Sequence, residues 1–325
     1  MKEKKLYSHW VLIAATVILV PLRIIQYFTI LEPQTGFYTE INALVYAFAA
    51  VMALTLFFFI FEGIKNGKRL EMVKQDKTNV GYGVACGLVM TMCSICILRH
   101  AGTCFGGDYE STVTAESQLD MEKIMMLEGI LAIISAVYFF ICGMMVILRK
   151  GFGEKLRVLS LVPVLWYLVR LITMFTKAIS YARVSELFLN MMMVAFFAMF
   201  LMNYAAVNGS VNSEGLEKKV YGYGYCAAIL AFVTFIPNAC LYFTGKGEMM
   251  YADYKMGYCD FTLALFIIIV VITRLAIKDE NTALQSVELK AESGKKEEAA
   301  DSENGEGENT EPVEAVTLSA TVTAE

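Results

Sequence analysis

Long apolar stretches alternate with short charged segments along most of this chain. A helix needs roughly 20 mostly apolar residues to cross a hydrocarbon core of about 30 Å. Eight stretches meet this requirement, at residues 8–31, 41–63, 80–98, 124–148, 156–176, 184–207, 220–243 and 257–277. The pattern therefore predicts an all-α integral membrane protein with eight transmembrane helices.

Features of the first half of the chain recur in the second half. Residues 23–29 and 170–176 share the order Arg, aliphatic, Ile, any, any, Phe, Thr. Three further matches follow in the same order: Glu40 with Glu186, Gly81-Tyr82-Gly83 with Gly222-Tyr223-Gly224, and Glu128 with Asp260. We interpret residues 1–150 and 151–278 as two four-helix membrane repeats. Because each repeat has an even number of helices, both enter the membrane from the same side and the repeats are parallel.

Composition and charge agree with a membrane location and distinguish the last segment from the rest of the chain. Apolar residues make up 57% of the chain, charged residues only 18%, and the mean hydropathy is +0.54. The last segment, residues 279–325, holds 13 acidic and 3 basic residues, whereas the rest holds 19 acidic and 24 basic residues. A segment with so little apolar surface is predicted to be disordered. We interpret it as an acidic tail that can dock a protein partner, and nothing in the chain resembles a nucleic-acid reader.

The distribution of basic residues predicts the orientation in the cell membrane. The N-terminus and the segments that follow every second stretch carry 16 Lys and Arg, whereas the opposite segments carry 6. Basic residues are enriched on the cytoplasmic side of membrane proteins. Both termini, including the acidic tail, are therefore predicted to lie in the cytoplasm.

Two arginines lie inside predicted membrane helices. An arginine deep in the hydrocarbon costs at least about 2.5–3.5 kcal/mol unless protein or water faces it. Arg23 lies ~12 Å and Arg170 ~9 Å from the outer ends of their stretches, at about 1.5 Å per residue. Glu128 and Asp260 lie near the same boundary in neighbouring stretches. We therefore predict an outer-leaflet charge cluster of Arg23, Arg170, Glu128 and Asp260, rimmed by Glu40 and Glu186.

The charge cluster has two interpretations. In the first, Arg23 pairs with Glu128 and Arg170 pairs with Asp260, and these ion pairs only fix how the helices dock. In the second, the cluster binds a ligand that is anionic or zwitterionic, because arginine suits carboxylate and phosphate recognition. Glu40 and Glu186 also have a simpler role, since an acid in the first turn of a helix complements the helix dipole.

Other candidate chemistry is weak. Most of the eight cysteines lie inside apolar stretches, where a thiol acts as a small hydrophobe, and Cys104 is predicted to lie in a loop. The two histidines, His9 and His100, lie near the ends of their stretches. We therefore predict no metal site, no cofactor and no enzyme activity. The Gly-Tyr-Gly motifs are predicted to serve close helix packing.

Two functions remain open from the sequence. The favoured one is a transporter for a small anionic or zwitterionic solute, with an outer site between the repeats, as repeat-built carriers have. The second is a membrane sensor or partner subunit that transports nothing. A carrier needs a polar lining that reaches the cytoplasmic half, and that half of the stretches is nearly all aliphatic or aromatic. This feature counts toward the second function.

Overall fold

The computed structural model describes residues 8–32, 38, 43–66, 70–72, 80–106, 115–148, 158–176, 184–209, 215–245 and 254–277. Glu40 and the predicted tail at residues 279–325 lie outside these ranges. Residues 1–277 form one compact unit.

Eight helices dominate the described part of the chain. They are α1 (Ser8–Thr29), α2 (Ala43–Asn66), α3 (Val80–Phe105), α4 (Ala115–Ile147), α6 (Leu161–Thr176), α7 (Val184–Asn208), α8 (Leu216–Phe243) and α9 (Tyr254–Arg274). Each falls on one predicted stretch. The prediction differs most at α3 and α4, because α3 continues to Phe105 and α4 begins at Ala115. Cys104 therefore lies in a helix, and its predicted loop position is wrong.

Two short strands follow helices that end at the same side of the bundle. Strand β1 (Leu70–Met72) pairs antiparallel with β2 (Leu275–Ile277), so that Glu71 lies opposite Ala276. The helix predicted at 257–277 therefore ends at Arg274, and the last three residues of that stretch form strand β2. This ladder joins the segment after α2 to the end of α9.

The helices are those of a multi-pass membrane protein. Six of them, α1, α2, α3, α4, α7 and α8, are long and apolar enough to cross a membrane. The apolar parts of α6 and α9, Leu161–Thr176 and Gly257–Thr273, are shorter. Large apolar side chains such as Val17, Leu54 and Ile95 are more than half exposed. Exposed apolar side chains in such number suit contact with lipid and are unusual in a soluble monomer.

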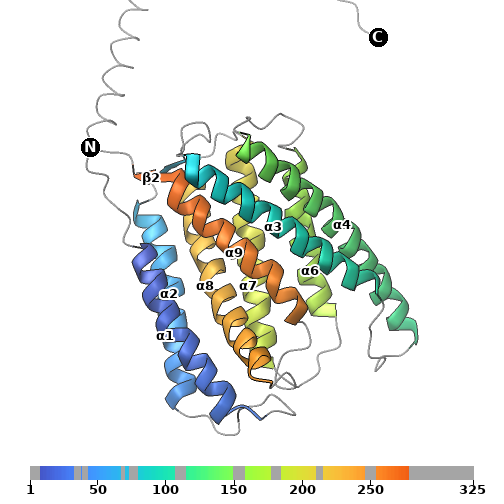
Figure 1. Cartoon of the computed structure of the whole chain (residues 1–325). Helices are drawn as coiled ribbons and strands as arrows, with labels where there is room; N and C mark the ends of the chain where they lie inside the picture. Colours follow the sequence, from blue (N-terminus) through green and yellow to red (C-terminus); the bar gives the residue numbers. More distant parts are fainter. Residues whose placement is uncertain are drawn as a thin grey trace, which may run out of the picture. The chain divides into compact units, whose positions relative to one another are not determined.

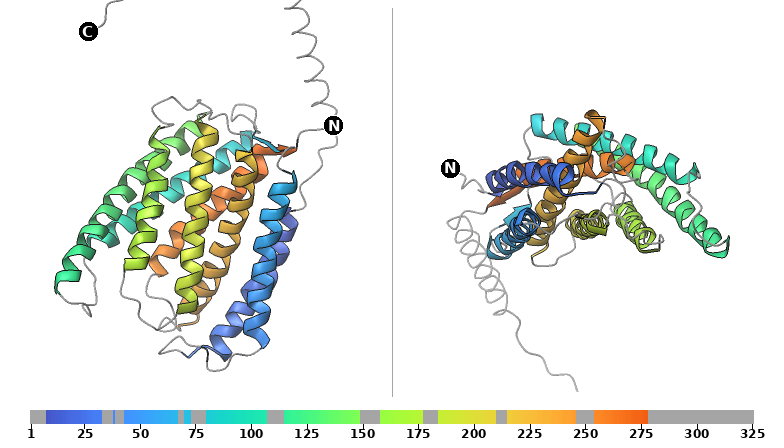
Figure 2. Two further views of the ribbon diagram at one scale, coloured as in Figure 1. Left: turned by 180° about the vertical axis from the view of Figure 1, so that it is seen from behind. Right: turned by 90° about the horizontal axis from the view of Figure 1, so that it is seen from below.

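Helix α8 is the central element of the bundle. It packs against α1, α2, α7 and α9, and nearly all its side chains from Val220 to Val233 are buried. Helices α1 and α2 form one pair beside α8, whereas α3 and α4 form a second pair beside α6 and α9 (Figure 1). The views from behind and from below agree with this arrangement (Figure 2).

Glycines set the closest helix approaches. A Cβ atom at Gly87 of α3 would lie 2.7 Å from the carbonyl oxygen of Gly143 of α4, and one at Gly143 would lie 2.9 Å from that of Gly87. The two backbones therefore touch where only glycine fits.

The Gly-Tyr-Gly motifs differ between the two halves. A Cβ at Gly224 would lie 3.0 Å from Ile267, so the packing prediction is confirmed there. At Gly81 and Gly83 no other described atom comes within 4 Å of that position, so the packing prediction is wrong there.

Candidate functional site

Most of the buried charges lie toward one end of the helix bundle. Arg23 and Arg170 each lie six residues before the ends of α1 and α6, whereas Glu186 and Asp260 lie near the beginnings of α7 and α9. Since chain direction alternates from helix to helix, these positions fall at one depth. All four side chains are at most 5% exposed.

Arg23 lies on the buried face of α1. Leu19, Arg23 and Gln26 are spaced as neighbours on one side of a helix and are all buried. The Arg23 Nη1 atom donates hydrogen bonds to Gln26 Oε1 (2.9 Å) and to the Tyr38 hydroxyl (2.8 Å). The guanidinium also lies over the Tyr27 ring, 4.9 Å from its centroid. These contacts hold the side chain in place through one nitrogen.

The other end of the guanidinium faces Glu186 without bonding to it. The Arg23 Nη2 atom lies 3.9 Å from Glu186 Oε1, and neither atom has a hydrogen-bond partner among the described residues. The same holds for Glu186 Oε2 and for Asn238 Oδ1. Buried polar groups are nearly always hydrogen-bonded. The arrangement thus presents one donor and three acceptors that other groups can bind.

These groups line a pocket between α1, α7 and α8. Its walls are Arg23, Tyr27, Glu186, Leu189, Asn190, Val233, Thr234 and Asn238. The unfilled space between these walls holds about one water-sized molecule. A larger solute therefore requires the walls to move apart.

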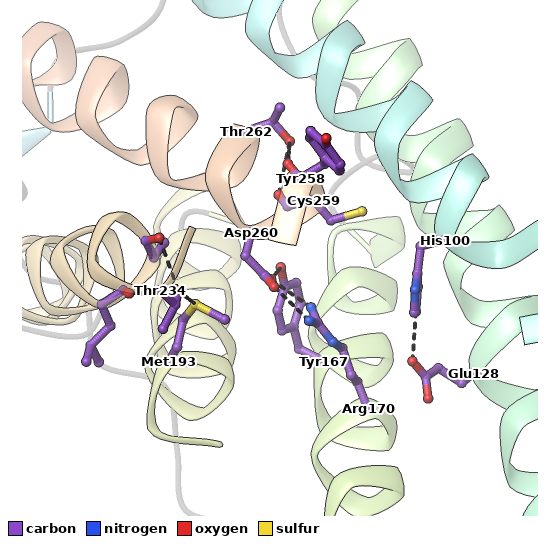
Figure 3. A network of polar contacts seen from close by, with 12 residues as sticks. His100, Glu128, Tyr167, Arg170, Met193, Thr234, Tyr258, Cys259, Asp260 and Thr262 are labelled. Atoms are coloured by element: carbon purple, nitrogen blue, oxygen red, sulfur yellow. Dashed lines mark hydrogen bonds and ion pairs between the residues drawn. The ribbon is translucent and has the colours of Figure 1, made fainter. Parts of the chain in front are cut away.

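Arg170 and Asp260 form a closed pair. Arg170 Nη1 and Nη2 each donate to one Asp260 oxygen at 2.7 Å, and the Tyr167 hydroxyl donates to Asp260 Oδ1 at 3.0 Å. Figure 3 shows the guanidinium and the carboxylate facing each other with the Tyr167 ring alongside. This two-bond geometry is the strongest arginine–carboxylate contact. The expected pairing of Arg170 with Asp260 is present.

Glu128 has a different partner from the one expected. Its Oε1 atom lies 2.8 Å from His100 Nε2 of α3, and the two residues are 1% and 2% exposed (Figure 3). The expected Arg23–Glu128 pair is therefore wrong. The physical reason is that α1 packs against α2 and α8, whereas α4 packs against α3 and α6.

A second polar contact, which the sequence analysis missed, lies at the other end of the bundle. Ser8 of α1 and Tyr221 of α8 both hydrogen-bond Glu62 of α2, the latter at 2.8 Å. In the sequence, Glu62 is a single acid near the end of an apolar stretch and resembles a residue at the membrane–water interface. Only its contacts with α1 and α8 show that it links three helices.

The six predicted site residues thus divide into four groups. Arg23 and Glu186 meet at the pocket, Arg170 and Asp260 are closed on each other, Glu128 meets His100, and Glu40 lies outside the described residues. No disulfide joins any of the eight cysteines.

Comparison of the chain with protein-family models, with curated proteins and with solved structures found no match.

Proposed function

We propose that the protein is a transporter for a small solute that carries a carboxylate, and that the solute binds in the pocket formed by Arg23, Glu186 and Asn238. One observation carries the proposal: a buried cation and a buried anion lie 3.9 Å apart with unpaired polar atoms beside a pocket. The second buried arginine differs, because Asp260 binds both of its terminal nitrogens and only Nε lacks a partner among the described residues.

The chemistry of the pocket favours a zwitterion. The Arg23 Nη2 group is a donor for the carboxylate of the solute. The Glu186 carboxylate and the Asn238 carbonyl are acceptors for its ammonium group. A zwitterion would separate the two side chains and satisfy both, whereas a simple anion would leave Glu186 facing a like charge. An amino acid is a solute of this kind.

The location of the pocket fits the proposed repeats. Arg23 belongs to the proposed repeat 1–150 and Glu186 to the proposed repeat 151–278, so the pocket would lie between them. Carriers built from repeats bind their solutes at such interfaces. With both termini in the cytoplasm, the pocket would open toward the outer side. The proposal also includes α6 and α9 as the seventh and eighth spans.

A membrane sensor is the second candidate, and aromatic packing favours it. On the β1–β2 side of the pocket, the rings of Phe59 of α2 and Tyr225 of α8 stack at 4.9 Å, and those of Tyr204 of α7 and Phe266 of α9 pack edge to face at 5.6 Å. All four side chains are buried. A carrier would have to separate such rings in each cycle, whereas a sensor would need only the pocket.

Uptake into proteoliposomes tests the proposal. The probes are radiolabelled L-alanine as a zwitterion and succinate as a dicarboxylate, each with the wild type, Arg23→Gln, Glu186→Gln and Glu217→Gln. Glu217→Gln is the matched control, because it makes the same change at the far end of α8. We expect L-alanine uptake by the wild type and the control. Glu186→Gln should reduce it at least tenfold, and Arg23→Gln should abolish it.

Two outcomes count against transport. Saturable binding of L-alanine without uptake would favour the sensor. Absence of both binding and uptake for both probes, or equal losses in Glu186→Gln and Glu217→Gln, would contradict the pocket as the solute site.

A further inference from the structure

The geometry points to a second site with different chemistry: we propose that His100, Cys104 and Glu128 bind one divalent transition-metal ion of the zinc type. This site is separate from the proposed solute pocket, and its residues lie on α3 and α4. The metal-binding atoms of the three side chains all lie within 4.8 Å of one another, and all three residues are buried.

The backbone places the three side chains together. His100 and Cys104 are four residues apart on α3, so they share one face of the helix. Glu128 reaches that face from α4. Next to it, a Cβ atom at Gly129 would lie 3.2 Å from Cys104 Cβ and 2.8 Å from the Phe105 ring. The absence of a side chain at Gly129 thus lets the last turn of α3 approach the carboxylate.

The distances are close to those of a zinc site. His100 Nε2 lies 3.6 Å from Cys104 Sγ and 2.8 Å from Glu128 Oε1. Tetrahedral zinc with ordinary bond lengths separates nitrogen from sulfur by about 3.6 Å and nitrogen from oxygen by about 3.3 Å. The first distance already fits. The second requires the carboxylate to move by about half an ångström, which a small rotation of the Glu128 side chain provides.

An unsatisfied carboxylate oxygen supports a cation at this position. Glu128 Oε2 has no hydrogen-bond partner among the described residues, although the residue is 99% buried. The Trp166 ring, whose centroid lies 5.7 Å from that of His100, covers the site from α6. A carboxylate oxygen with no partner in such surroundings is costly unless a cation is near.

The charges also balance with a metal. A divalent ion, a Cys104 thiolate, a Glu128 carboxylate and a neutral imidazole sum to zero. The adjacent Arg170–Asp260 pair also sums to zero. A mixed nitrogen, sulfur and oxygen ligand set suits zinc and cobalt better than calcium or magnesium, which prefer oxygen alone. Three protein ligands leave a fourth position for water.

Cobalt binding tests the site. The full-length protein is purified without a histidine tag, stripped with chelator and titrated with Co²⁺, and the thiolate-to-cobalt absorption band is measured. We expect one equivalent to bind to the wild type. Cys104→Ser should remove the band, and His100→Ala should weaken Co²⁺ binding by at least about 100-fold. Cys93→Ser is the matched control, because Cys93 is buried on the same helix outside the cluster.

A second measurement does not depend on a variant. Zn²⁺ should protect Cys104 of the wild type from alkylation in detergent, as read by mass spectrometry, and Mg²⁺ should not. The proposal is wrong if the wild type gives no thiolate band. It is also wrong if the band persists in Cys104→Ser or if Zn²⁺ leaves the alkylation of Cys104 unchanged.

Discussion

Removing Arg170 should destabilise the protein strongly, because Asp260 then lies buried without its cation. Arg170→Met removes two charge-assisted hydrogen bonds of 2.7 Å. Bonds to charged groups contribute about 1.5–3 kcal/mol each, and breaking a buried pair costs about 3–5 kcal/mol. Both estimates agree on a loss of roughly 3–5 kcal/mol. At 1.4 kcal/mol per factor of ten, the unfolding equilibrium shifts by about two to three and a half powers of ten.

Removing the partners as well should restore the stability in steps. Arg170→Met with Asp260→Leu removes both charges of this pair, but the Tyr167 hydroxyl loses its acceptor. A stranded buried hydroxyl costs about 1–3 kcal/mol. Adding Tyr167→Phe removes that hydroxyl too. The unfolding free energy of the triple variant should therefore lie within about 1 kcal/mol of the wild-type value, since apolar replacements of buried pairs are often neutral.

The assay is equilibrium unfolding in mixed detergent micelles. Trp166 is fully buried and its ring lies 4.7 Å from that of Tyr167, so tryptophan fluorescence reports on this region once the only other tryptophan, the exposed Trp10, is replaced by Phe in every variant. Circular dichroism gives an independent measure of helix content. The reasoning is refuted if Arg170→Met loses less than about 1 kcal/mol. A double variant no more stable than the single one would refute it as well.

Two other variants test the packing. Gly143→Ala places a Cβ 2.9 Å from the Gly87 carbonyl oxygen and should cost about 1–3 kcal/mol in unfolding free energy, whereas Gly81→Ala, with open space around it, should cost less than about 0.5 kcal/mol. Equal losses in the two variants would contradict the close helix approach. Tyr221→Phe removes a hydrogen bond to Glu62 and should lower the unfolding free energy by about 1–2 kcal/mol in the same assay. Tyr82→Phe, at an exposed position, is its control. An unchanged unfolding curve for Tyr221→Phe would show that this contact contributes nothing.

The sequence predicted the helices well, because hydropathy and length are local properties. All eight predicted stretches contain a helix. The difference at α3 arises because Arg99 and His100 resemble the end of a span. In the structure, α3 continues for about two turns beyond the predicted end at residue 98, and His100 is buried against Glu128. His100 and Cys104 are four residues apart, and this helical spacing was the one feature of the sequence that indicated a polar face at the end of α3.

The pairing of charges was harder to predict, because it depends on which helices touch. Depth along the helix placed Arg23, Arg170, Glu186 and Asp260 near one level, and the structure brings them there in pairs. Depth alone did not show that α1 packs on α8 and far from α4. Glu128 was therefore assigned to Arg23, whereas His100 takes that position. The internal repeat stays a prediction.

The most direct test of the account is whether the Arg23–Glu186 pocket is reachable by water while the Arg170–Asp260 pair is sealed. Asn190→Cys, in the pocket wall, and Thr173→Cys, one turn from Arg170 on its buried face, are each treated with a small, membrane-impermeant thiol reagent and compared with the unmodified parent. The account predicts rapid labelling at position 190, slowed by L-alanine, and no labelling above the parent at position 173. An inert thiol at position 190, or equal labelling at both positions, would contradict it.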